Sequence, residues 1–193
     1  MQSNIVLAST SLFRKALLEK LNISFETVSP NFEENQLENE KPIDLVQRLS
    51  LGKAKAVAKQ YTNHLIIGSD QVACIEGEVL GKPGNFGKAM TQLQKASGKT
   101  VTFYTGLTLF NSKTNKDQTL CDEFKVHFRL LSDKQITHYL EKEEPYNCAG
   151  SFKSEGFGIS LFKKLEGDDP NTLVGLPLIK LIEMFEHEGI MIP

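Results

Sequence analysis

The chain has 193 residues, of which 40% are hydrophobic and 24% are charged, and its formal net charge at pH 7 is -2. The length predicts one globular domain spanning residues 1–193, and the composition excludes disordered and collagen-like classes. The slight acidic excess argues against a general nucleic-acid binder, and the apolar runs are far shorter than the roughly 20 residues of a membrane span.

The cysteines and the N-terminal residues bear on the compartment. Cys74, Cys121 and Cys148 are odd in number and widely spaced, which favours buried reduced thiols over a disulfide framework or a cysteine metal site. Met1–Asn4 lacks the basic leader that precedes a signal peptide's apolar core. We therefore expect a cytoplasmic protein without a membrane segment.

Apolar periodicity and turn residues predict alternating strands and helices in the first half of the chain and longer strands in the second. In the first part of the chain we expect a strand at Asn4–Ala8, a helix from Phe13 to Leu18 capped within Ser9–Ser11, a strand at Ile23–Val28, a helix from Pro42 to about Tyr61, and a strand at His64–Asp70 with a second extended piece at Gln71–Ile75. A loop at Gly77–Gly87, a helix at Lys88–Ala96, a strand at Thr100–Phe110 and a turn at Asn111–Asp117 are expected next. The last expected elements are a strand at Glu123–Leu131, a helix at Asp133–Glu143 capped by Ser132, and a closing helix at Leu176–Glu186.

Three loop segments keep two interpretations each. The acidic run Glu33–Glu40 is typical of a solvated face, although single carboxylates within it can be functional. Gly150–Gly156 fits either a bend between strands or a ligand-facing loop, because glycines flank alternating charges. Gly167–Thr172 is a turn in the first instance.

Several chemistries can be tested on spacing alone. Lysine follows glycine at four places, but none has the glycine five residues earlier that a phosphate-binding P-loop requires. The four histidines lie far apart, which makes a histidine metal site improbable. Asp70 follows an apolar strand, where clefts commonly open, so it is either a catalytic carboxylate or a cap of the next turn.

Six blocks in the sequence resemble those of the Maf-type nucleotide pyrophosphatases, in the branch that acts on 7-methyl-GTP, over nearly the whole chain. The blocks are Leu7–Ser11 with Arg14, Leu49 with Lys53–Ala54, Gly68–Gln71, Gly81–Pro83, Cys148–Gly156 and Asp169–Pro177. The resemblance implies a single α/β domain with an elongated mixed sheet flanked by helices, similar to inosine triphosphatases, and two lobes around a central cleft. It implies hydrolysis of a nucleoside triphosphate to the monophosphate and pyrophosphate. A homodimer is retained as an option for its assembly.

The same resemblance assigns roles to individual residues. Asp70 matches the proton acceptor, and the substrate-binding positions are Ser9, Arg14, Glu34, Lys53 and Lys82. The cations suit a triphosphate, and Asp70 and Glu34 are expected to hold a divalent Mg²⁺ or Mn²⁺ cofactor through carboxylate oxygens.

Phe13, Gln71 and Glu155 occupy positions that set base specificity. The family branch acting on dTTP and UTP tends to carry Arg, Thr and Gln there. A carboxylate such as Glu155 accepts both donors of guanine, and an aromatic face such as Phe13 favours the positive ring of N7-methylguanine. Phe13 could instead be a core residue. Rival functions are hydrolysis of other triphosphates, such as dTTP, UTP or inosine triphosphate, and a nucleotide-binding regulator of septum formation.

Overall fold

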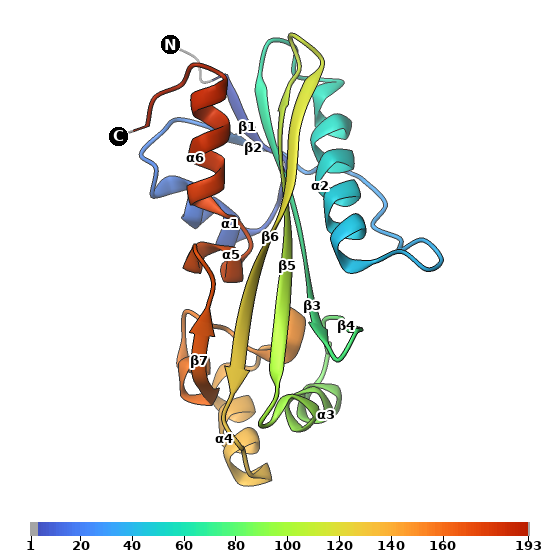
Figure 1. Cartoon of the computed structure of the whole chain (residues 1–193), viewed down its shortest axis with the longest axis vertical. Helices are drawn as coiled ribbons and strands as arrows, with labels where there is room; N and C mark the ends of the chain where they lie inside the picture. The colour runs from blue at the N-terminus through green and yellow to red at the C-terminus, as the bar shows by residue number, and fades with distance from the viewer. Residues whose placement is uncertain (1–3, 193) are drawn as a thin grey trace. The chain divides into compact units, whose positions relative to one another are not determined.

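The computed structural model describes residues 4–192, in which helices surround a seven-stranded sheet of order β2-β1-β3-β5-β6-β7, with β4 paired to β3 (Figure 1). The strands are β1 (Ile5–Leu7), β2 (Glu26–Thr27), β3 (Leu65–Ile75), β4 (Glu78–Leu80), β5 (Thr100–Asn111), β6 (Lys116–Phe128) and β7 (Phe162–Glu166). The α-helices are α1 (Leu12–Glu19), α2 (Pro42–Ala58), α3 (Phe86–Ala96), α4 (Asp133–Glu143), α5 (Pro170–Val174) and α6 (Leu178–His187), with 3₁₀ turns at η1 (Ala149–Ser151) and η2 (Phe157–Leu161).

The sheet is mixed, as predicted. β1 runs parallel to β2 and β3, whereas β4 is antiparallel to β3 and β7 is antiparallel to β6. Within residues 4–192 no helix combines the length and apolar character needed to cross a bilayer. Of the N-terminal segment considered for a leader, Met1–Asn4, the first three residues lie outside this range.

The described chain falls into two compact units. Unit 1 comprises residues 4–71, 105–122 and 169–192, and unit 2 comprises Val72–Tyr104 and Glu123–Asp168. Strands β3, β5 and β6 contribute residues to both units. The single-domain organisation with a cleft between two lobes, which the resemblance implies, stays a prediction.

In unit 1 both faces of the parallel strands are covered, which explains their unbroken apolar runs. Alternate side chains point to opposite faces, so Leu7 and Ile67 pack in one cluster with residues of α1 and α6, whereas Val6 and Ile66 pack in another with Ala54 of α2. Figure 1 shows α1 and α6 on one side of these strands and α2 on the other.

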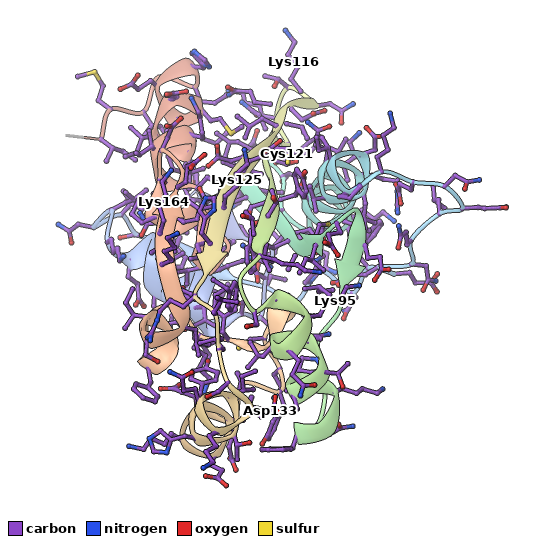
Figure 2. The ribbon with its side chains drawn as sticks, turned by 60° about the horizontal axis from the view of Figure 1, so that its bottom comes forward. Lys95, Lys116, Cys121, Lys125, Asp133 and Lys164 are labelled. Carbon is purple, nitrogen blue, oxygen red and sulfur yellow. The ribbon has the colours of Figure 1, made fainter. Side chains whose placement is uncertain are left out.

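Unit 2 has its own core. Four phenylalanines meet edge to face with ring centroids 4.9 to 5.5 Å apart, and α3 and α4 each bury one face. These rings are Phe103, Phe128, Phe152 and Phe162. The side chain of Gln94, on α3, donates to the carboxylate of Asp133, on α4, at 2.8 Å. Asp133 is labelled in Figure 2. Ser132 forms the expected cap of α4.

The elements depart from the sequence expectations in several places. β3 is one continuous strand rather than two pieces, and β2 and the turn before β6 are shorter than predicted. Strands β4 and β7 and helix α5 were not predicted, because runs of three to five residues carry too little periodicity. Of the cysteines, Cys74 is buried, whereas Cys121 and Cys148 are only partly so, and all three are outside disulfides.

Candidate active site

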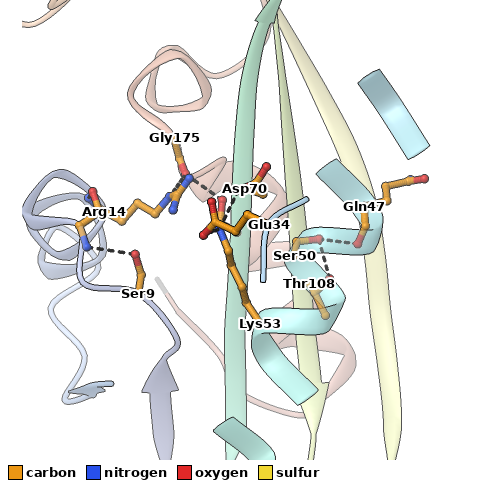
Figure 3. A network of polar contacts seen from close by, with 11 residues as sticks. Ser9, Arg14, Glu34, Gln47, Ser50, Lys53, Asp70, Thr108 and Gly175 are labelled. Carbon is orange, nitrogen blue, oxygen red and sulfur yellow. Dashed lines mark hydrogen bonds and ion pairs between the residues drawn. The ribbon is translucent and has the colours of Figure 1, made fainter. Parts of the chain in front are cut away.

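Three charged side chains meet beside β3 in unit 1. The Nζ of Lys53, on α2, lies 2.6 Å from Oδ1 of Asp70 and 2.8 Å from Oε1 of Glu34 (Figure 3). Lys53 and Asp70 are only 4% and 7% exposed, whereas the side chain of Glu34 is 56% exposed. Two carboxylates therefore share one ammonium, and one of them faces solvent.

Asp70 lies in the middle of β3 rather than at the end of a strand, which corrects the sequence interpretation. The reason is that β3 outlasts its parallel neighbour: β1 pairs with Leu65–Ile67 and ends there. Asp70 thus stands three residues beyond the carboxyl end of β1. The expected environment, an edge where parallel strands stop, is present although the strand itself continues.

Two glycines set the position of the helix that carries Lys53. A Cβ at Gly68 of β3 would lie 2.0 Å from the backbone oxygen of Ser50, and one at Gly106 of β5 would lie 2.1 Å from that of Val46. Backbone oxygens cannot yield as a flexible side chain can. Glycine at both positions therefore lets α2 pack directly on the strands and brings Lys53 to Asp70.

Arg14 is held by the opposite end of the sequence. Its Nε donates to the carbonyl of Gly175 at 2.8 Å, and the buried hydroxyl of Ser69 donates to the same oxygen at 2.9 Å (Figure 3). Burial lowers the pKa of the Arg14 guanidinium, and the charges of Asp70 and Glu34 oppose that shift. The guanidinium is therefore within electrostatic range of both carboxylates and remains a cation.

Ser9 lies at the start of α1. Its hydroxyl oxygen, on a residue 7% exposed, accepts from the amide of Ser11 at 3.1 Å, and Ser11 in turn caps the helix by accepting from the Arg14 amide. Accepting a bond leaves the Ser9 hydroxyl proton free to donate elsewhere. The predicted N-cap is thus confirmed at Ser11.

The carboxamide of Gln71 has a defined orientation. Its Nε2 donates to the carbonyls of Thr172 and Leu173 at 2.7 and 3.3 Å and to the hydroxyl of Thr105 at 2.9 Å. Because carbonyl oxygens only accept, the nitrogen must face them. Gln71 is partly exposed, and its remaining polar atom, Oε1, is an acceptor.

Three predicted site residues remain to be placed. Phe13, in the first turn of α1, is 45% exposed, which excludes the core interpretation. Lys82 and Glu155 belong to unit 2 and are both exposed. Burial raises the pKa of the Cys148 thiol, with smaller and opposite effects from the charges of Glu155 and Lys82.

The glycine-rich segment that carries Glu155 is tied to α4. The amide of Lys153 donates to the hydroxyl of Tyr139 at 3.0 Å, and its Nζ donates to the carbonyl of Glu143 at 2.7 Å. A Cβ at Gly158 would lie 2.1 Å from the Lys153 carbonyl oxygen, so the backbone of this segment packs tightly on itself.

Sequence reasoning missed the residues that support this site. Ser69, Thr105 and Gly175 carry no charge and were given no role, although Ser69 and Gly175 lie in family blocks. The segment from Gly167 to Thr172 was expected to be a turn in the first instance. The structure makes its continuation α5, whose C-terminal carbonyls hold Gln71. The residue that could have indicated this support is Asp169, which precedes Pro170 in the sequence. In the structure its carboxylate is buried, caps α5 and also accepts from the amide of Ile179.

The carboxylate pair can also be tested against a divalent cation. Asp70 and Glu34 already bracket a cation, the Lys53 ammonium, and offer the oxygen donors that Mg²⁺ and Mn²⁺ prefer. Residues 4–192 contain no group of three or more His, Cys, Asp or Glu side chains arranged to hold a metal. The residues therefore fit a metal that takes its other ligands from phosphate oxygens and water, as Mg²⁺ commonly does.

Comparisons with known proteins agree with these features. A chain from Colwellia psychrerythraea is 59% identical over 186 residues, covering 96% of this chain and 93% of its own length, and one from Aliivibrio fischeri is 55% identical over 190 residues, covering 98% of each. Both are named 7-methyl-GTP pyrophosphatase. The structure of the Staphylococcus aureus Ham1 protein shares the fold, with a TM-score of 0.52 at 14% identity over 96% of this chain and 99% of that one. The model of the Maf-like proteins matches residues 4–188, and the chain belongs to that family.

Proposed function

We propose that the chain hydrolyses 7-methyl-GTP between its α and β phosphates, yielding the 7-methylated monophosphate and pyrophosphate. Support comes from relatives that carry the name of this activity at 55% and 59% identity over nearly the full chain. The observation that carries the proposal is the cluster in which Lys53 bridges Asp70 and Glu34.

Asp70 is the base in this proposal. It is 7% exposed and accepts from Lys53 at 2.6 Å, so one of its oxygens is held while the other can orient a water and take its proton. A triphosphate entering the site competes with the carboxylates for the Lys53 ammonium. The second oxygen of Asp70 remains the one that acts on the attacking water.

Arg14, Lys53 and the first turn of α1 supply the positive potential for the phosphates. The Arg14 guanidinium is fixed through Nε by Gly175, which leaves its terminal nitrogens to bind oxygen. The Ser9 hydroxyl and the N-terminal amides of α1 add neutral donors and a favourable dipole. Lys82 is proposed as a further phosphate ligand from the family resemblance alone.

A divalent cation, Mg²⁺ or Mn²⁺, would be held by Asp70 and Glu34. When bound, it supplies Lewis-acid stabilisation of charge on the phosphate oxygens. We expect excess EDTA to abolish turnover and added Mg²⁺ or Mn²⁺ to restore it. Undiminished turnover in EDTA would remove this assignment.

Selectivity for the base is proposed for Phe13, Gln71 and Glu155. An exposed aromatic ring can stack on the positive ring of N7-methylguanine, and a carboxylate accepts both donors of the guanine edge. Gln71 is consistent with this, because its fixed amide presents an acceptor. Pyrimidine bases match these groups less well.

The test is pyrophosphate release from 7-methyl-GTP, GTP, inosine triphosphate, UTP and dTTP at equal concentrations. We expect the highest kcat/KM for 7-methyl-GTP, and a preference for UTP and dTTP would move the chain to the other branch. Asp70→Asn should lower kcat on the order of a hundredfold with nucleotide binding retained. Asp117→Asn, the same change at an exposed carboxylate of β6, is the matched control. Binding without turnover in the wild type would favour a regulatory role.

A further inference from the structure

The segment Glu33–Glu40, here named the acidic loop, precedes α2 and carries Glu34. In Figure 1 it extends outward from the start of that helix. We infer that the ion pair of Arg48 with Glu40 clamps the acidic loop onto α2 and thereby positions Glu34 against Lys53. Arg48 and Glu40 are thus positioning residues for the reaction.

The clamp is a bidentate pair with additional bonds. Arg48 donates through Nε and Nη2 to the two oxygens of Glu40 at 2.6 and 2.7 Å, and Nη2 also donates to the carbonyl of Asn35 at 2.9 Å. The amide of Leu37 donates to Glu40 at 3.1 Å. One guanidinium therefore binds the loop next to Glu34 and at its C-terminal end.

The geometry distinguishes this pair from an ordinary surface ion pair. Exposed pairs contribute little, because solvent screens them and two flexible side chains must be ordered. Here the Glu40 side chain is only 8% exposed and Arg48 is 33% exposed. The hydrogen bond from Arg48 lowers the pKa of Glu40, so the carboxylate stays charged through the neutral range.

A second anchor holds the start of the loop. The Phe32 ring lies over Gly52 of α2, where an added Cβ would come within 2.2 Å of Cζ. Phe32 and Arg48 therefore fasten the chain on both sides of Glu34 to the helix that carries Lys53. The placement of Glu34 2.8 Å from Lys53 follows from these two attachments.

The composition of the acidic loop explains why it needs a clamp. The acidic loop contains four glutamates and one large apolar residue, Leu37, which is itself 56% exposed. With so little apolar burial, the loop has little to offset the entropy of being ordered.

This inference rests on the proposed function, because a role for Glu34 in turnover comes from there. The experiment compares Arg48→Lys, Glu34→Gln and the double variant by kcat/KM for 7-methyl-GTP and by hydrogen exchange of the loop amides. Lysine keeps the charge but cannot form the parallel pair of bonds. Arg129→Lys is the matched control, because the Arg129 side chain donates to the Ser160 carbonyl and both residues belong to unit 2.

We expect Arg48→Lys to speed exchange in residues 33–40 and to lower kcat/KM about tenfold, as a displacement below 1 Å would. In the Glu34→Gln background the same change should cause no further loss. Unchanged loop exchange, unchanged kcat/KM or fully additive losses would each overturn the inference. A wild type without pyrophosphate release would refute the proposed function instead, and loop exchange in Arg48→Lys would still decide the clamp.

Discussion

Replacing Gly68 by alanine tests whether the close approach of α2 to β3 sets the candidate site. The added Cβ would lie 2.0 Å from the Ser50 oxygen and 3.1 Å from both the Cβ and the amide nitrogen of Ala54. All three are backbone or short side-chain atoms. The helix must therefore move away from the strand.

The size of the movement follows from the contact distance. Ordinary contacts of a Cβ begin at 3.4 Å, so α2 has to shift by about 1.4 Å near Ser50. Lys53 lies on the next turn, and its 2.6 Å bond to Asp70 would lengthen beyond hydrogen-bond range if nothing compensated. Overpacking of this kind costs about 1 to 3 kcal/mol of stability, and a misplacement of roughly 1 Å costs about a hundredfold in rate.

The assay combines urea unfolding with kcat/KM for 7-methyl-GTP. Gly87→Ala is the control, because Gly87 lies in α3 with its nearest neighbour at 3.7 Å, so alanine there should leave stability equal or higher. We expect Gly68→Ala to lose both stability and activity. An unfolding midpoint and kcat/KM equal to those of the wild type would refute the packing argument.

Changes at Gly106, Glu40 and Glu155 provide three further tests. Gly106→Ala should destabilise the fold by a similar amount, because its Cβ would meet the backbone of α2 at 2.1 Å, but it should lower kcat/KM less than Gly68→Ala, since this contact lies two helical turns before Lys53. The pKa of Glu40 is lowered in the folded state, so the stabilisation by its carboxylate is complete above the ordinary pKa of 4.5 and is lost as the pH falls through the folded-state pKa. The difference in urea-unfolding free energy between wild type and Glu40→Gln should therefore shrink below pH 4.5. Glu155→Gln should lower kcat/KM for 7-methyl-GTP about ten- to a hundredfold and that for UTP less, because an amide faces a guanine donor with a donor, and an equal loss on both substrates would assign Glu155 to the phosphates or the fold.

Some of the fold could be predicted from local pattern alone. An element's type can be predicted where its own residues give a long or specific pattern. Examples are the apolar spacing of α2, the capping box of α4 and the long β-rich run of β5. β4, β7 and α5 do not give such a pattern, because three to five residues form an element only when a partner strand or helix is present. Their boundaries depend on pairings that the sequence does not display.

The charged residues of the candidate site could be proposed from the sequence through the family resemblance, because cations and carboxylates suit phosphate chemistry. That Lys53 meets both Asp70 and Glu34 was decided by the tertiary structure, since two glycines admit α2 to the sheet and Arg48 draws the acidic loop to that helix.

The uncharged support of the site depended on the fold entirely. Arg14 is fixed by a carbonyl 161 residues away, and Gln71 is oriented by carbonyls about a hundred residues away. Every residue carries a backbone carbonyl, so sequence cannot single out the one that accepts a given bond. Residue types determined which chemistry was available to this chain, and only long-range packing decided which groups are held, in which orientation, to perform it.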